Sequence, residues 1–277
     1  MIYITTAMHC EAKPFIDRWN LKKDSASSIF RVYKNSDRIL LITGVGVVSA
    51  AVGATYLLTR YPPRFGDMFM NIGICGAKDK DIKKGQAVLC HKIIHHDTGR
   101  CYYPDMLFKH PFLEGVLETF SRPVDKALRP SVEGDVVDME GAGAYQAAER
   151  FLSHGAIHCI KIVSDYLEGN KLDKGQVTDL IEGNVPAVSR WISVVEDLLP
   201  LPEPLFTKEE EEYLDRVCQN LRLTVALKHQ LKHLAGQYTV RSQDLVEALK
   251  PFGDIKCTSK NEVKRYFEQL KGRLMEY

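Results

Sequence analysis

The sequence predicts an α/β domain with a mostly parallel or mixed central sheet flanked by helices, followed by an all-helical C-terminal appendage. Stretches of strand and helix character alternate through the first part of the chain. Several of the strands are apolar throughout, as strands covered on both faces of a sheet must be. Prolines at alternate positions of "LLPLPEPLF" then interrupt the pattern, because neither a helix nor an inner strand tolerates them. We therefore place a domain boundary near Pro204, between residues 1–204 and 205–277.

The elements of the first domain are predicted from local patterns. Apolar runs bounded by turn residues predict strands at 1–6, 28–35, 38–44, 67–77, 85–96 and 156–165. Small and apolar residues at helical spacing predict helices at 10–19, 47–61, 143–151 and 184–199. The strand at 67–77 should run into a glycine-rich turn. The run at 156–165 is interpreted as an uninterrupted apolar strand that ends in the polar pair Ser164 and Asp165.

Helical segments are expected in the C-terminal module at 207–240, 241–253 and 259–274. Thr207 with Glu210 is predicted to form a capping box, and Ser242 to cap a later helix. Apolar positions at helical spacing should bury one face of these helices. They are Leu221, Val225, Leu227, Leu231 and Leu234. Because about seventy residues is near the lower limit for independent stability, we expect this face to pack against the first domain or another chain.

Composition and charge argue against several classes of protein. Of the 277 residues 45% are hydrophobic, and 37 Lys and Arg against 36 Asp and Glu give a formal net charge of +1. That balance does not indicate a nucleic acid or a membrane surface as the main partner. We expect neither a bilayer-spanning segment nor a signal peptide, since the sequence has no pattern of either kind. Seven cysteines without a CxxC pair fit reduced thiols, so the chain is expected to be cytoplasmic.

Candidate ligand-binding residues follow the predicted strands. In open α/β sheets, ligands bind beyond the carboxyl ends of the strands. Three acids stand at such positions, namely Glu11, Glu140 and Asp165. Glu140 belongs to "VVDMEGAG", where it should begin a helix and be kept ionised by the helix dipole. Gly143 in the same stretch allows the backbone to approach another element or a ligand closely. On the octapeptide alone, Asp138 and Glu140 are interpreted as ordinary helix-start acids.

Other motifs carry less information. "TGVGVVSA" lacks the third glycine of a dinucleotide-binding fingerprint, and no phosphate-loop lysine follows it. "CHKIIHHDTGRC" gathers three histidines, two cysteines and one aspartate, but strand alternation would send neighbours to opposite faces. No standard metal-ligand spacing and no nucleophile elbow occur. We therefore predict neither a metal nor a cofactor.

Five short motifs occur in a fixed order along the first domain. They are "AMHCEAKPF", "LLITGVGVVSAAVGATYLL", "NIGICGA", "VVDMEGAGAYQAAERF" and "IHCIKIVSD". Together they resemble the nucleoside phosphorylase and nucleosidase superfamily, most closely its methylthioadenosine/S-adenosylhomocysteine nucleosidase branch, over residues 1–199. Each motif alone is weak, whereas five in the right order are specific. The resemblance implies a nucleoside phosphorylase-like fold.

The resemblance assigns roles to the candidate residues. In this family the last acid of the first motif, here Glu11, activates the attacking water. Met139 and Glu140 match the Met-Glu pair that holds the ribose, and Asp165 matches the aspartate that works at the purine. The other substrate-binding candidates are Ser164, Gly76, Ile74 and Cys75. A purine departs more easily once N7 is protonated, and Asp165 can supply that proton or a hydrogen bond if burial raises its pKa.

The sequence departs from the family pattern in two places. In the phosphorylases, the "NIGICGA" turn carries an Arg and a hydroxyl residue that hold phosphate, where this chain has Asn71 and Ile74. The nucleosidases usually keep the hydroxyl too, so Ile74 is unusual for both. The segment between Gly76 and Met139 is shorter than in the typical nucleosidase and lacks its purine-stacking loop. We expect Phe108, Phe112 or a residue of another subunit to stack on the base instead.

These features predict an enzyme that hydrolyses the N-glycosidic bond of a purine nucleoside of adenosine type, with or without a 5′ substituent. The implied partners are a purine nucleoside or free base and further copies of the chain in a homo-oligomer. Within the enzyme class, the alternatives are a nucleoside phosphorylase and a futalosine hydrolase-like enzyme. From a different class, the alternative is a non-catalytic nucleoside-binding protein on the same fold, with the helical tail engaging a partner.

Overall fold

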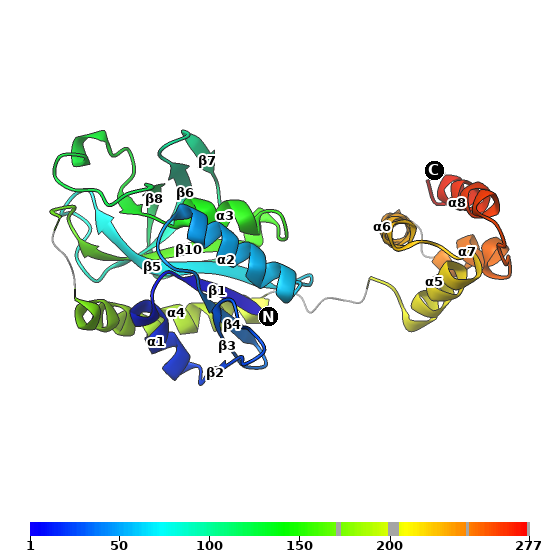
Figure 1. Cartoon of the computed structure of the whole chain (residues 1–277), viewed down its shortest axis with the longest axis horizontal. Coiled ribbons are helices and arrows are strands. Elements are labelled where there is room, and N and C mark those ends of the chain that lie inside the picture. Colours follow the sequence, from blue (N-terminus) through cyan, green and yellow to red (C-terminus); the bar gives the residue numbers. More distant parts are fainter. Residues whose placement is uncertain (170–172, 199–204, 242–243, 276–277) are drawn as a thin grey trace. The chain divides into compact units, whose positions relative to one another are not determined.

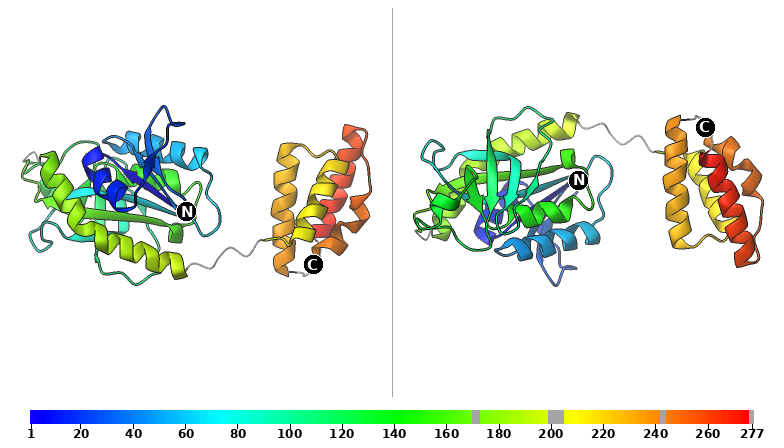
Figure 2. Two further views of the ribbon diagram at one scale, coloured as in Figure 1. Left: turned by 90° about the horizontal axis from the view of Figure 1, so that it is seen from below. Right: turned by 90° about the horizontal axis from the view of Figure 1, so that it is seen from above.

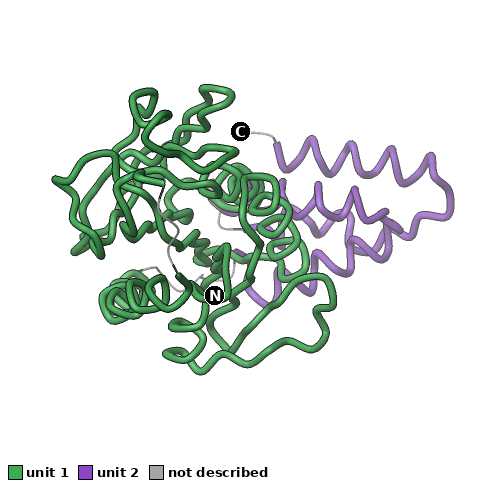
Figure 3. Tube along the Cα trace, turned by 60° about the vertical axis from the view of Figure 1, so that its left-hand side comes forward, with its two compact units in different colours: residues 1–200 green, residues 201–277 purple. Residues whose placement is uncertain are grey.

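The chain consists of two compact units, residues 1–200 and 201–277 (Figure 3). The structure, a computed structural model, describes residues 1–169, 173–198, 205–241 and 244–275. The predicted boundary near Pro204 and the predicted cap at Ser242 lie outside the described residues. Within the described ranges, no helix is long and apolar enough to cross a membrane.

Ten strands of the first unit form one mixed sheet. They are β1 (Ile2–Thr6), β2 (Lys22–Lys23), β3 (Arg31–Lys34), β4 (Arg38–Ile42), β5 (Met68–Ala77), β6 (Ala87–His95), β7 (Arg100–Tyr102), β8 (Leu113–Thr119), β9 (Val136–Asp138) and β10 (Ile157–Asp165). Two 3-10 helices, Arg129–Ser131 and His154–Ala156, lie in the connections. The six predicted strands are all present, and β2, β7, β8 and β9 are additions.

The strand pairings close part of this sheet into a ring. β5 pairs in parallel with β10, and β10 pairs antiparallel with β6. β6 and β8, and then β8 and β9, pair in parallel, and β9 returns antiparallel to β5. From β5 the sheet also continues outward through β1 and β4, both parallel, to the antiparallel strands β3 and β2. The carboxyl ends of β1, β4, β5 and β10 therefore meet at one edge, where a ligand site is expected.

Four helices cover the two faces of this sheet. α2 (Val47–Arg60) and α3 (Gly141–Ala148) pack on each other and on one face, where they share a core with residues such as Phe69 and Leu117. α1 (His9–Arg18) and α4 (Lys174–Leu198) pack on each other over the opposite face. Figures 1 and 2 show the two helix pairs on either side of β1, β5 and β10. The all-apolar strands of the sequence are thus the ones covered on both sides.

Gly143 allows the close approach of α3 to α2. A Cβ atom at this position would lie 2.1 Å from the backbone oxygen of Val47, the first residue of α2. No side chain fits there, because real Cβ contacts are never so short. The expected close approach at Gly143 is therefore to another helix, and it fixes the start of α2 beside the start of α3.

Three predictions about the first unit were wrong in detail. The glycines of "NIGICGA" do not form a turn, because β5 continues to Ala77 with its residues paired to β10 and β9. The last helix, α4, starts at Lys174, ten residues before the predicted start, and contains Pro186. The strand β10 is not apolar throughout, since Lys161 and His158 are buried in it.

The second unit contains four helices, α5 (Lys208–Asn220), α6 (Val225–Arg241), α7 (Leu245–Gly253) and α8 (Lys260–Met275). Figure 2 shows them side by side in a small bundle. The capping box of Thr207 and Glu210 is confirmed. The helix expected at 207–240 is instead two helices, since the chain turns at Arg222, where φ is 52°.

The apolar positions of the second unit pack on one another. Leu221, Leu231 and Leu234 are buried in a core that this unit forms from its own helices, and Leu227 packs against it. Val225 was wrongly assigned to the buried face, because it is 72% exposed. The unit thus buries its helix faces internally.

Candidate functional site

The predicted site residues lie around one cavity of about 520 Å³ at the carboxyl edge of the sheet. The eight that line it are Glu11, Ile74, Cys75, Gly76, Met139, Glu140, Ser164 and Asp165. They come from four separate parts of the chain, namely α1, β5, the β9–α3 junction and the end of β10. The fold therefore brings together the eight predicted catalytic and substrate-binding residues, but not the predicted stacking residues Phe108 and Phe112.

Glu11 is held at the inner wall of the cavity by backbone amides. One carboxylate oxygen accepts a hydrogen bond of 2.8 Å from Met8 N, and the other accepts one of 2.9 Å from Ile74 N. The residue is only 2% exposed. Burial raises the pKa of Glu11, although the hydrogen bonds from Ile74 and Met8 oppose the rise. A carboxylate with a raised pKa is a stronger base than a free one, as deprotonation of water requires.

Glu140 precedes the first helical residue of α3, but its side chain does not cap that helix. Instead, one carboxylate oxygen accepts a hydrogen bond of 2.8 Å from Gly46 N, and the other accepts one of 3.3 Å from Met139 N. The α3 amides are bound by other groups, since Gly141 N donates to Asp138. The Glu140 carboxylate is thereby available to the cavity.

The expectation that the helix dipole keeps Glu140 ionised was wrong. Burial, and next the neighbouring Asp138 carboxylate, raise the pKa of Glu140 to about 7. The Lys161 ammonium and the hydrogen bond from Gly46 lower it only in part. Desolvation of the side chain therefore outweighs the N-terminal dipole at this position. Glu140 is divided between its protonated and ionised forms near neutral pH.

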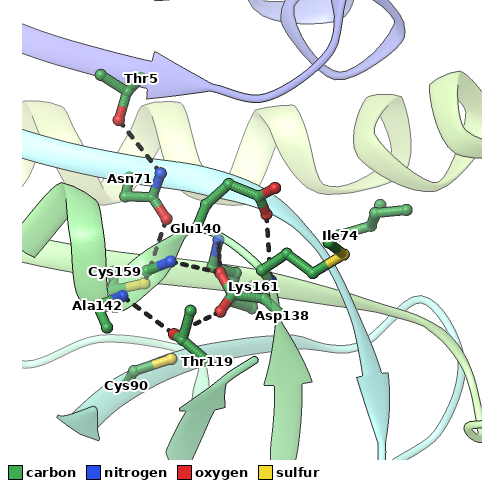
Figure 4. A network of polar contacts seen from close by, with 12 residues as sticks. Thr5, Asn71, Ile74, Cys90, Thr119, Asp138, Glu140, Ala142, Cys159 and Lys161 are labelled. Carbon is green, nitrogen blue, oxygen red and sulfur yellow. Dashed lines mark hydrogen bonds and ion pairs between the residues drawn. The ribbon is translucent and has the colours of Figure 1, made fainter. Parts of the chain in front are cut away.

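A buried ion pair between Lys161 and Asp138 lies next to Glu140 and supports the site. Lys161 Nζ lies 2.7 Å from a carboxylate oxygen of Asp138, and both side chains are almost completely buried. Thr119 donates a hydrogen bond of 2.7 Å to the same carboxylate and accepts one of 3.0 Å from Ala142 N (Figure 4). Burial alone would lower the pKa of Lys161, but the Asp138 charge raises it, so the lysine stays protonated. The pair fixes β9, β10 and the start of α3 relative to one another.

Asn71 does not line the cavity. Its side-chain amide donates a hydrogen bond of 3.2 Å to Thr5 Oγ1 and accepts one of 3.6 Å from Cys159 Sγ (Figure 4). The residue is buried between β1 and β10. The residue that stands in place of a phosphate-binding arginine is therefore a polar link inside the sheet.

Ser164 and Asp165 both face the cavity although they are consecutive strand residues. Strict alternation would send them to opposite faces, but the register between β10 and β5 shifts between Val163 and Asp165. Ser164 Oγ is 2.7 Å from one Asp165 oxygen, and Leu167 N donates a hydrogen bond of 2.9 Å to the other. The Asp165 side chain is partly buried at this edge of the cavity.

Neither predicted stacking residue reaches the cavity. Phe112 packs edge-on against Trp191, and Phe108 packs edge-on against His158, both in the core beneath α4. No aromatic residue occurs among the described residues of the cavity wall. Beside Asp165 the wall is aliphatic, and its members there include Val124 and Leu167.

Sequence reasoning missed several residues of the site and its support. Gly46 stands at a predicted strand end, but its amide bond to Glu140 was not foreseen, and Arg122 and Lys174, which line the cavity, were not predicted at all. Lys161 could have been found, because a lysine within an otherwise apolar strand needs a buried partner. Arg122 follows β8 and Lys174 begins α4, and nothing in the immediate sequence of either residue marks it.

The segment of three histidines and two cysteines does not form a metal centre in the structure as described. Among all the residues that the structure describes, no group of three or more His, Cys, Asp or Glu side chains could hold a metal ion. His95 and His96 bond instead to Thr98 and Glu118.

Comparisons with known proteins point to the same superfamily, and the family match covers the first three of the five motifs. Residues 2–129 match the family model described as the phosphorylase superfamily. The 5′-methylthioadenosine/S-adenosylhomocysteine nucleosidase of Marinomonas sp. (strain MWYL1) is 35% identical over 66 residues, 24% of this chain and 27% of that protein. The enzyme of the same name from Tolumonas auensis is 36% identical over 78 residues, 27% of this chain and 33% of that protein. The matched segments thus span a third or less of these curated relatives.

Solved structures extend the likeness to the fold. The 5′-methylthioadenosine nucleosidase of Arabidopsis thaliana in apo form matches with a TM-score of 0.60 and 18% identity, covering 70% of this chain and 95% of that one. The native futalosine hydrolase of Helicobacter pylori matches with a TM-score of 0.56 and 16% identity, covering 70% of this chain and 97% of that one. The resemblance to the nucleoside phosphorylase and nucleosidase superfamily is confirmed, and the fold is of that type.

Proposed function

We propose that this protein is an N-ribosyl hydrolase that releases the base from a purine nucleoside of adenosine type. One observation carries the proposal: three carboxylates from different elements, Glu11, Glu140 and Asp165, line a single cavity. The names of the related enzymes support the same reaction class. The three groups differ in burial and in their hydrogen-bond partners. Such different environments are what separate acid, base and sugar-binding roles require.

Asp165 acts at the leaving base. Cleavage of the glycosidic bond moves its electron pair onto the purine, which departs more easily when N7 receives a proton. Asp165 carries that proton to N7 while Ser164 and Leu167 N hold its two oxygens. The aliphatic wall formed by Val124 and Leu167 contacts the purine faces.

Glu140 and Glu11 act at the sugar. The ionised Glu140 accepts hydrogen bonds from the ribose hydroxyls, and its negative charge stabilises the ribosyl cation that forms as the base leaves. Glu11, fixed by Met8 N and Ile74 N, takes a proton from the water whose oxygen bonds to C1′. The products are the free base and ribose, and solvent returns the proton from Glu11 to Asp165.

Phosphorolysis is the less favoured reaction at this site. The Ile74 side chain has no donor for a phosphate oxygen, and its backbone amide is bound to Glu11. Asn71 is bonded inside the sheet. A phosphate at this wall would face the Glu11 carboxylate, which repels it if ionised. We therefore propose water as the nucleophile.

The test is reversed-phase chromatography of the base released from a nucleoside panel, with and without inorganic phosphate. The panel contains adenosine, 5′-methylthioadenosine, inosine and futalosine. We expect release of adenine, with free ribose or its 5′-substituted form as the second product, at a rate independent of phosphate. A strict dependence on phosphate with ribose 1-phosphate as the product would make the protein a phosphorylase.

Two further results would each correct the proposal. Release from futalosine alone would assign the protein to that hydrolase activity. Saturable nucleoside binding without release from any member would support a non-catalytic binding protein. Assembly into a homo-oligomer remains a prediction, and sedimentation analysis of the full chain tests it.

A further inference from the structure

A second hollow of about 560 Å³ adjoins the cavity. The two share Ala7, Met8, Cys10, Val45 and Lys174 in their walls, so they lie side by side along those residues. Asp165 and Leu167 lie in the wall of the first cavity only, and His9 and Arg31 lie in the wall of the second only. Asp165 therefore lies away from the second hollow, which adjoins the cavity on the side of the shared residues.

The second hollow is strongly cationic. Its wall contains Lys13, Arg31 and Lys174, together with His9, and among its described residues there is no carboxylate. Lys13 forms an ion pair with Asp17. Arg31 and Lys174 have no ion pair among the described residues and are exposed. This concentration of positive charge occurs in a chain whose formal net charge is only +1.

The fold places these cations at the ligand-binding edge. Arg31 begins β3 and pairs with Ile42, the last residue of β4, so it lies where the parallel strands end. Lys174 is the first residue of α4, where the helix dipole favours acids over lysines. The carboxylate of Asp173 accepts hydrogen bonds from Gly175 N and Gln176 N at this helix start, so the Lys174 ammonium remains available to an anion in the cavity. Burial raises the pKa of the Cys10 thiol in the shared wall, and the Lys174 charge opposes this rise.

The chemistry of a nucleoside indicates what reaches this hollow. The base is attached to C1′ and the 5′ carbon to C4′, on opposite sides of the ring oxygen. With the base at Asp165 and the ribose hydroxyls at Glu140, the 5′ substituent extends away from the base. It then passes Met8 and Val45 into the cationic hollow.

We propose that the substrate is a purine nucleotide, whose 5′-phosphate binds to Arg31 and Lys174. This inference rests on the proposed hydrolase function and specifies its substrate class. Arginine and lysine are the side chains suited to phosphate oxygens, through charge-assisted hydrogen bonds. A neutral 5′-methylthio group would leave both cations without an anionic partner.

The test compares three adenine compounds with different 5′ groups. Release of adenine is measured from adenosine 5′-monophosphate, 5′-methylthioadenosine and S-adenosylhomocysteine, which carry a dianion, a neutral group and a zwitterion. We expect kcat/KM to be about tenfold or more higher for the monophosphate, the difference made by one charge-assisted hydrogen bond. This preference should fall as the salt concentration rises. Adenosine 5′-triphosphate is a fourth arm, which distinguishes a monophosphate site from one for a longer chain.

Charge reversal at the hollow supplies matched variants. Arg31→Glu and Lys174→Glu should each lower the ratio of kcat/KM for the monophosphate to that for 5′-methylthioadenosine about tenfold or more. Lys174→Glu places an acid at a helix start, which favours the helix, so loss of folding does not explain its effect. Lys109→Glu makes the same change at an exposed loop residue outside both cavities, and it should leave the ratio unaltered.

The outcomes separate this inference from the function on which it rests. Efficient cleavage of 5′-methylthioadenosine with poor cleavage of the monophosphate would overturn the inference and leave the hydrolase proposal intact. If no compound releases adenine, the hydrolase proposal fails, and calorimetry then tests the phosphate site separately. Tighter binding of the monophosphate than of adenosine would support that site. Equal or weaker binding of the monophosphate would refute it. Cleavage of a neutral nucleoside that requires inorganic phosphate would assign the cations to a co-substrate and refute the inference.

Discussion

The carboxylate of Glu11 accepts a 2.9 Å hydrogen bond from the backbone amide of Ile74. This bond does not depend on the side chain at position 74. The isoleucine that replaces the hydroxyl residue of the family therefore leaves the backbone support of Glu11 in place. What the substitution removes is a second donor to the water or phosphate beside that acid.

Replacement of Asp165 by Asn should lower kcat about 10²–10⁴-fold, the usual contribution of a general acid. Binding should change much less, because the proton is needed mainly in the transition state. Adenine release and equilibrium binding of substrate measure the two effects separately. Asp81→Asn, an exposed change outside the cavity, is the control. Equal losses in binding and turnover would indicate a structural role for Asp165.

Glu140→Gln should change how stability depends on pH. The pKa of Glu140 rises from 4.5 to about 7 on folding, so the native state binds more protons than the unfolded state between these pH values. Stability from this group is therefore highest below pH 4.5 and falls as pH rises to about 7, by about 3 kcal/mol in total. The variant lacks this loss, so its free energy of unfolding relative to that of the wild type should increase as the pH rises from 4.5 to about 7. Urea unfolding at several pH values tests it, and a constant difference would contradict the raised pKa.

Glu140→Gln should also weaken recognition of the ribose. An amide has one acceptor oxygen in place of two, so it cannot accept hydrogen bonds from both hydroxyls as the carboxylate does. We expect KM to rise for the nucleoside with both hydroxyls. The 2′,3′-dideoxy compound should bind wild type and variant equally poorly, and a selective loss with that compound would place Glu140 elsewhere.

Lys161→Met should destabilise the first unit by about 3–5 kcal/mol, because it leaves the buried Asp138 carboxylate without its partner. The double variant Asp138→Asn with Lys161→Met removes both charges and should be more stable than the single lysine variant. Urea unfolding of the two proteins gives the comparison. A double variant no more stable than the single one would show that the unpaired charge is not the cause.

Gly143→Ala should cost about 1–3 kcal/mol or more, since the added Cβ meets the Val47 oxygen and forces α3 away from α2. Gly183→Ala is the matched control, because this glycine lies within α4 with no atom near its missing Cβ. That change should stabilise by up to about 1 kcal/mol through helix propensity. Thermal unfolding of both variants tests these two predictions. Similar changes in stability for Gly143→Ala and Gly183→Ala would contradict the close approach of α3 to α2.

A fragment of residues 1–204 should be soluble, cooperatively folded and active in base release. The second unit buries residues such as Leu214 and Leu270 in a core of its own, and the first unit has separate cores, so we expect each unit to fold on its own core. Calorimetry and the adenine assay on the fragment test this. Insoluble protein, or loss of a single sharp transition, would show that residues 205–277 stabilise the first unit.

The elements and the site residues were predictable from the sequence because both depend on local signals. Apolar runs marked the strands, and Glu11, Glu140 and Asp165 stand where strands end. The protonation of Glu140 was not predictable, since it depends on burial and on the nearby Asp138, which only folding establishes. The orientation of Asp165 depends equally on a register shift that no residue pattern marks.

The cationic hollow escaped prediction for the same reason. Its cations are far apart in the sequence, at positions 13, 31 and 174, and the overall charge balance conceals them. Phe108 and Phe112 were misassigned because an aromatic residue near a site in sequence can equally fill the core. The Phe108 ring packs against His158, and the Phe112 ring packs against Trp191.

The closed ring of β5, β10, β6, β8 and β9 determines how copies of this protein can meet through their strands. Each strand of the ring has two neighbours within it, and among the described strands β2 and β7 are the ones that pair with a single strand. Both are short, and both carry cations, Lys22 and Lys23 in one and Arg100 in the other. Two such edges repel each other and offer few amides for pairing, which protects the sheet from edge-to-edge aggregation during synthesis and storage.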